Sequence, residues 1–167
     1  MYLEIPRNKV DAKLLKIRLE AVGYEVKHDE DNDLFLLNNW VYIHIILRQL
    51  TPLVLIRGYL PITSKLSDDE LQKLCAEAND QSLTVHYTTL RGDDGYPGLV
   101  GDHSLFYPSG LKISDLTFSI QYLADSIHYL RENYKSDNQL FLKPTNCLYN
   151  AHKTRFKEGK KYEVYKK

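Results

Sequence analysis

VYIHIILRQLTPLVLIRGYL, residues 41–60, is the stretch that decides the fold. It contains two runs rich in β-branched and aliphatic residues, 41–47 and 53–60, with a polar break and Pro52 between them. Runs of this length and composition predict two adjacent strands. In 53–56, four aliphatic residues follow one another without alternation, which indicates burial on both faces or a strand covered by a helix. We therefore place this pair at the centre of a sheet.

Length and composition indicate one globular domain. The chain has 167 residues, of which 43% are hydrophobic and 26% charged, enough for a single sizeable core. No apolar run reaches the roughly 20 residues of a membrane span, and the amino terminus lacks a signal-peptide pattern. We expect a cytoplasmic protein without membrane contact. Cys75 and Cys147 lie in dissimilar contexts, which argues against a disulfide framework or a zinc site.

Three helices are predicted around the central strands. The first spans 9–22, with Asn8 as its cap and Gly23 just past its end. Its apolar stripe at Val10, Leu14, Ile17 and Ala21 is widened by Leu15, Leu19 and Val22, which predicts a broad buried face. The second follows Ser67-Asp68-Asp69-Glu70, which is a capping box, and ends at Asn79-Asp80. Ser114 is expected to cap the third, which ends at Asn133; its apolar stripe comprises Leu116, Ile120, Leu123, Ile127 and Leu130.

Strand-like segments at 24–28, 34–37, 83–90 and 99–107 complete the element order α-β-β-β-β-α-β-β-α. This order predicts an α+β domain over residues 1–133, an antiparallel β-sheet with helices packed on it. Residues 134–167 form a separate basic extension. They carry 9 Lys or Arg and 3 Asp or Glu, whereas 1–133 carry 13 and 19, so a net charge of zero conceals an acidic body and a basic tail.

Catalytic, cofactor and metal sites are not expected. The six histidines are dispersed without metal-ligand spacing, and a histidine in a strand, such as His44, is more simply explained by hydrogen bonding at the sheet surface. Asp29, Asp31 and Asp33 have the first spacings of a calcium loop, but Leu34 and Trp40 stand where that loop requires Gly and Glu. We interpret this acidic run as a solvated hairpin turn. The glycine-containing loop 91–98 lacks the ending of a nucleotide-binding loop.

The basic tail allows two interpretations. Its cations and rings could neutralise phosphates and stack on bases, and the candidate nucleic-acid contacts are Lys153, Arg155, Phe156, Lys157, Lys160, Lys161 and Tyr162. The acidic body would repel nucleic acid, however, which favours a solvated or self-docking extension.

One family resemblance involves several of these segments. Ala78-Asn79 before a strand, a glycine hairpin, Leu105-Phe106-Tyr107, Gly110-Leu111 and a long amphipathic helix resemble the YbjN family, whose description associates it with bacterial sensory transduction regulation. The segments Gly23-Tyr24 and Ile56-Arg57-Gly58-Tyr59 are compatible with this resemblance, which covers roughly residues 9–133. It implies the fold of type III secretion chaperones and a non-enzymatic domain acting by protein contacts, often as a homodimer.

Three functions remain in competition at this stage. The first is a chaperone-like or regulatory adaptor that binds a protein partner. The second is an accessory protein that binds nucleic acid through the tail. The third is a small enzyme using His86 or His103 with the 91–98 loop as a lid, for which no activated nucleophile or acid–base pair can be named.

Overall fold

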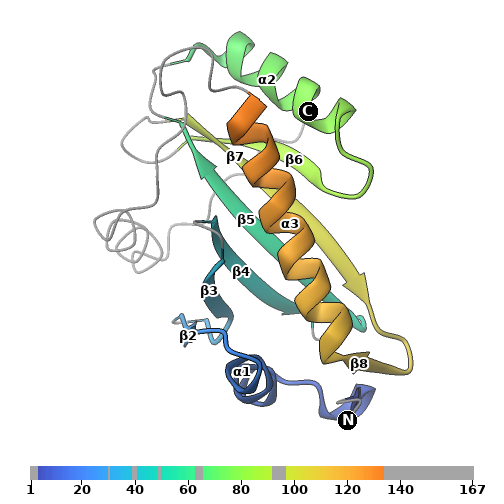
Figure 1. Ribbon diagram of the computed structural model, residues 1–167. Coiled ribbons are helices and arrows are strands. Elements are labelled where there is room, and N and C mark those ends of the chain that lie inside the picture. Colours follow the sequence, from blue (N-terminus) through green and yellow to red (C-terminus); the bar gives the residue numbers. More distant parts are fainter. Residues whose placement is uncertain are drawn as a thin grey trace.

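The computed structural model describes residues 4–29, 31–38, 41–48, 50–62, 66–91 and 97–133. Its centre is a six-stranded antiparallel sheet with strand order β2-β3-β4-β5-β7-β6 (Figure 1). The strands are β2 (Val26–His28), β3 (Leu34–Asn38), β4 (Val41–Arg48), β5 (Leu53–Pro61), β6 (His86–Arg91) and β7 (Pro97–Phe106). The stretch 41–60 therefore supplies the two middle strands, as predicted.

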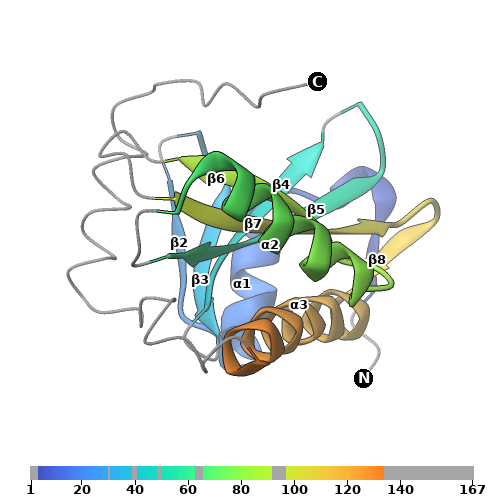
Figure 2. The ribbon, with the colours of Figure 1, turned by 90° about the horizontal axis from the view of Figure 1, so that it is seen from above.

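Three helices accompany the sheet: α1 (Ala12–Ala21), α2 (Asp68–Asp80) and α3 (Ile113–Asn133). α3 runs across one face of the sheet, with α1 on the same side, while α2 lies beside β6 (Figures 1 and 2). The predicted stripe of α3 is confirmed, since Leu116, Ile120, Leu123, Ile127 and Leu130 are all at most 3% exposed. We call the sheet face under α3 the inner face. The predicted α+β class with an antiparallel sheet is confirmed.

The predicted start of the first helix is wrong, and its predicted buried face is confirmed only at Leu15 and Leu19. Its cap is Asp11, not Asn8, and the Asp11 carboxylate accepts a hydrogen bond of 2.7 Å from the Leu14 amide. The buried side chains are Ala12, Leu15 and Leu19, whereas Ile17 is 51% exposed. Apolar residues occupy so much of this helix that periodicity alone did not distinguish the two faces. Beyond its end, Gly23 has a φ of +99°, the left-handed conformation expected there.

For the other two helices, the predicted start of α2 is confirmed and the predicted start of α3 is wrong. Ser67 and Glu70 form the predicted capping box at the start of α2. Ser114 is not a cap, because α3 begins one residue earlier, at Ile113, directly after strand β8. The end of α3 at Asn133 agrees with the prediction.

A second, two-stranded sheet was not predicted. β1 (Glu4–Pro6) pairs with β8 (Gly110–Lys112), and Ile5 lies opposite Leu111. Both side chains are buried in the core, at 2% and 1% exposure. Strands of three residues are too short to show a period, and Pro6 argues against a strand at this position.

Within the described residues, none of the helices is long and apolar enough to span a bilayer.

Candidate functional site

The face of the sheet opposite α3, which we call the open face, carries the candidate site. Strand register identifies it, because Cα partners in neighbouring strands point to the same side. His44 is opposite Arg57 and Arg57 is opposite Asp102, while the neighbouring Gly58 faces Ile127 of α3. No helix within the described ranges covers the open face (Figures 1 and 2). Its residues include Phe35, Leu37, Tyr42, His44, Ile46, Leu55, Arg57, Tyr59, Asp102 and Phe106.

The open face combines two exposed apolar side chains, Leu37 and Phe106, with buried ones such as Tyr42 and Leu55 and with the Arg57–Asp102 ion pair. Leu37 and Phe106 are 50% and 61% exposed, and the rings of Phe35 and Tyr42 stack with centroids 5.6 Å apart. In the middle, the Arg57 guanidinium donates two hydrogen bonds to the Asp102 carboxylate, of 2.7 and 2.8 Å. The hydrogen bond to Asp102 raises the pKa of Arg57 above its already high value, so the guanidinium remains charged.

At the β2–β3 end of this face, Asp29 closes the turn between the two strands. One carboxylate oxygen of Asp29, Oδ1, accepts hydrogen bonds from the amides of Asp31 and Asp33, at 3.0 and 2.8 Å. Asn32 has a φ of 64°, a left-handed conformation that asparagine tolerates better than most residues. The turn expected from the acidic run is therefore present, and its geometry is fixed by Asp29 itself.

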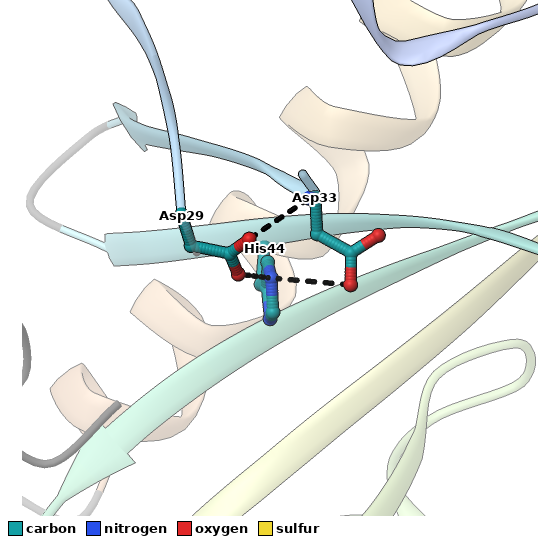
Figure 3. A group of neighbouring side chains, drawn as sticks. All are labelled: Asp29, Asp33 and His44. Atoms are coloured by element: carbon teal, nitrogen blue, oxygen red, sulfur yellow. Dashed lines mark hydrogen bonds and ion pairs between the residues drawn. The ribbon is translucent and has the colours of Figure 1, made fainter. Parts of the chain in front are cut away.

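His44, on β4, connects this turn to the sheet. Its Nε2 atom lies 2.8 Å from Oδ2 of Asp29 and 3.7 Å from Oδ2 of Asp33. Figure 3 shows the two carboxylates directed toward the imidazole. The His44 side chain is only 10% exposed, and the edge of its ring contacts Phe35, with centroids 6.2 Å apart. We call Asp29, Asp33 and His44 the Asp-Asp-His cluster.

The electrostatics of the cluster favour a positive charge at its centre. Burial raises the pKa of Asp33, the nearby His44 lowers it, and the negative charge of Asp29 raises it again. A hydrogen bond to the Leu47 backbone and repulsion from Asp31 act more weakly, in opposite directions. Two carboxylates this close repel each other unless a cation lies between them.

The sequence-predicted site residues are distributed as follows. The seven candidate nucleic-acid contacts, Lys153, Arg155, Phe156, Lys157, Lys160, Lys161 and Tyr162, lie outside the described residues. His86 and His103 do not form a pair: His86 is opposite Asp102 on the open face, whereas His103 contacts Tyr122 of α3 from the inner face. Most of the 91–98 loop, residues 92–96, also lies outside the described ranges.

The Asp-Asp-His cluster was missed because its parts were considered separately. The acidic run was judged against a calcium loop and His44 against other histidines. The hairpin register could have combined them, since pairing of 34–38 with 41–45 brings His44 beside Phe35, two residues after Asp33. That register was not assigned from the sequence.

Comparison with known proteins places the fold. No protein-family model matches the sequence, and no curated protein matches it either. Among solved structures, the chain superposes on YbjN from E. coli with a TM-score of 0.62 at 19% identity, covering 81% of this chain and 97% of that chain. The fold is YbjN-like. The resemblance inferred from Ala78-Asn79 and the later segments is therefore confirmed at the level of fold.

A second structural neighbour comes from an archaeon. This uncharacterised protein from Methanothermobacter thermautotrophicus has a TM-score of 0.54 at 14% identity, covering 75% of this chain and 99% of that chain. E. coli YbjN itself is described as a candidate transcription regulator. This chain covers almost all of both solved chains, 97% and 99% of their lengths.

Proposed function

We propose that this protein is a non-enzymatic regulatory domain that binds a protein partner through the open face of its sheet. The observation that carries the proposal is the unequal covering of the sheet: α3 lies on one face, and no described helix lies on the other. The YbjN-like fold and the description of E. coli YbjN as a candidate regulator support this role. An apolar surface surrounding a charged pair is a typical contact surface for proteins.

Neither edge of the sheet is well suited to pairing with a strand of the partner, which leaves the open face as the contact surface. At one edge, the backbone of Tyr87 in β6 is hydrogen-bonded to the side chain of Asn79 in α2. At the other edge, β2 has only three residues, Val26–His28. A partner strand therefore has little free backbone with which to extend the sheet. The exposed side chains Leu37 and Phe106 are better placed to make contact.

Substitution of the open face tests this proposal. We expect L37D and F106D each to reduce recovery of one specific protein when the full chain is purified from its native cells under mild conditions. L83D is the matched control, because Leu83 is 97% exposed and precedes β6, away from the open face. The recovered protein should then bind the purified full chain, with an affinity at least tenfold lower for F106D. The proposal is refuted if L37D and F106D both recover the partner protein and bind it as well as the wild type does.

The partner can also be a second copy of the chain. Sedimentation of the wild-type protein over a range of concentrations measures this directly. A dimer formed through the open face would dissociate at higher concentrations in F106D than in L83D. A dimer insensitive to both open-face substitutions would assign self-association to another surface.

Nucleic-acid binding through the tail is the second candidate, favoured by the charge division and by the description of E. coli YbjN. We expect the full chain to retard DNA or RNA in a gel more strongly at low salt than at moderate salt. Replacing Lys157, Lys160 and Lys161 by Gln should remove that difference. A salt-sensitive shift that survives these substitutions would exclude the tail as its source.

A further inference from the structure

The Asp-Asp-His cluster brings together three side chains that are common metal ligands. Asp29 and Asp33 come from the β2–β3 turn and His44 from the middle of β4. One ligand atom from each residue lies within 4.8 Å of the other two. The cluster is more than a group of surface acids, because His44 is 8% exposed and its Nε2 is directed at both carboxylates (Figure 3).

The spacing of these atoms agrees with coordination of one small ion. Zinc binds imidazole nitrogen and carboxylate oxygen at about 2.0 to 2.2 Å, so two neighbouring ligand atoms are about 3.0 to 3.5 Å apart. The two distances from Nε2 of His44, 2.8 Å to Asp29 and 3.7 Å to Asp33, lie on either side of that interval. These two distances reach that interval with adjustments of a few tenths of an ångström, and the ligand oxygens of Asp29 and Asp33 lie within 4.8 Å of each other.

Two of the three ligands are held in place by the protein. Oδ1 of Asp29 is held by the amides of Asp31 and Asp33, which leaves Oδ2 directed at the cluster centre. His44 is fixed by its place in a middle strand and by its contact with Phe35. Ligands that are already oriented bind an ion at a lower entropic cost.

The donor set indicates the class of ion. Calcium takes six to eight oxygen ligands and magnesium retains an octahedral shell of oxygen, so neither is suited to an imidazole with two carboxylates. Zinc and its transition-metal neighbours accept mixed nitrogen and oxygen ligands. We propose that Asp29, Asp33 and His44 bind one divalent transition-metal ion, best matched by Zn²⁺, with water completing the coordination.

Binding would replace the hydrogen bond between His44 and Asp29. An ionised carboxylate can only accept a hydrogen bond, so Nε2 of His44 donates in its contact with Asp29. When the ion binds, the neutral ring carries its proton on Nδ1 instead, and the freed Nε2 lone pair coordinates the metal. The charge of the ion then offsets the repulsion between the two carboxylates.

Calorimetric titration of the full chain with Zn²⁺, and with Co²⁺ as a spectroscopic probe, tests the site. We expect one ion per chain at this site, with an affinity at least tenfold lower in D33N and in H44Q. D31N is the matched control, because Asp31 belongs to the same turn but not to the cluster, and its affinity should remain within twofold. Ca²⁺ should bind more weakly than Zn²⁺ by a similar factor.

Several results would overturn the proposal. If the wild-type chain binds neither ion at millimolar concentration, the cluster serves only to attach the turn to β4. If D33N and H44Q bind Zn²⁺ as tightly as the wild type, the ion is held elsewhere. His44 is buried, so circular dichroism must first show that H44Q is folded; if it is not, D33N and the Co²⁺ absorption spectrum decide the question. Asp33 is less buried and its amide variant keeps the same shape, so D33N should fold.

Discussion

The side chain of Asn79 hydrogen-bonds both backbone groups of Tyr87: its Oδ1 accepts from the Tyr87 amide at 2.7 Å, and its Nδ2 donates to the Tyr87 carbonyl at 2.9 Å. The carboxamide thereby makes the two bonds that a residue of a neighbouring strand would make. Cys75, one turn earlier on α2, also contacts the Tyr87 carbonyl, at 3.2 Å. A helix side chain therefore satisfies the outer backbone groups of the edge strand β6 at this residue.

Replacing Asn79 should destabilise the fold. In N79A, the amide and carbonyl of Tyr87 lose these partners, and the unfolding free energy should fall by about 1 to 3 kcal/mol. N79D should also be destabilised, because a carboxylate can accept from the amide but cannot donate to the carbonyl. Urea denaturation measures both effects. The exposed Gln81, just past the helix, offers a control, and Q81A should change stability by less than about 0.5 kcal/mol.

Gly58 allows α3 to lie close to β5, and a methyl group there should be costly. An added Cβ would lie 2.3 Å from Cδ1 of Ile127 and 3.4 Å from Leu123. We expect G58A to lower stability by about 1 to 3 kcal/mol through overpacking. I127V removes the clashing Cδ1 atom, so G58A should cost less in that background. A double-mutant cycle measures the difference, and purely additive effects would contradict the close approach.

The capping box of α2 should make stability depend on pH in acid. Hydrogen bonds from the Ser67 hydroxyl and the Ser67 amide lower the pKa of Glu70. A lowered folded-state pKa adds stability that is present above the unfolded value and is lost as the pH falls through the folded one. Wild type should therefore exceed E70Q in stability at neutral pH and lose this advantage in acid.

The Ser67 hydroxyl provides the control for that measurement, because its hydrogen bond is the largest cause of the Glu70 shift. In an S67A background, E70Q should have a smaller pH-dependent effect. S67A alone should cost about 0.5 to 2 kcal/mol, as for other helix caps. An undiminished pH effect of E70Q in S67A would point to a different origin.

Tyr87 should limit stability in alkali. Burial raises its pKa from 10.0 to about 12, while the hydrogen bond of 2.9 Å between its hydroxyl and Ser126 acts in the opposite direction. Because the folded pKa is raised, the contribution is complete below pH 10 and is lost as the pH rises toward 12. Wild type should lose stability more steeply than Y87F over this interval. The exposed Tyr129 supplies the control, since Y129F should follow the wild-type curve.

The parts of the fold that were predictable are those in which local sequence and packing agree. The strands around 41–60 and the stripe of α3 are long enough for their periods to be clear, and the Ser67–Glu70 box depends only on neighbouring residues. The start of α1 was missed because two polar residues, Asn8 and Asp11, could both serve as a cap. β1 and β8 were missed because their pairing connects residues that are distant in sequence.

The site depended even more on long-range placement. Asp29 and His44 are separated in sequence by the whole of β3, and only the β3–β4 register brings them within 2.8 Å. The predicted end of α2 at Asn79-Asp80 is confirmed, but the hydrogen bonds from the Asn79 side chain to β6 were not predicted. A polar residue near a helix end is explained by that position alone, so the hydrogen bonds from Asn79 to β6 could not be predicted from the local sequence.

The pairing of Ile5 with Leu111 affects how the protein can form. Joining two strands across so much intervening chain carries a large loop-closure entropy, so this contact is expected after the hairpins of the main sheet have assembled. During synthesis, β1 emerges long before β8 and can pair with it only after the main sheet has been made. α3, which begins directly after β8, would then be anchored at its first turn by β1.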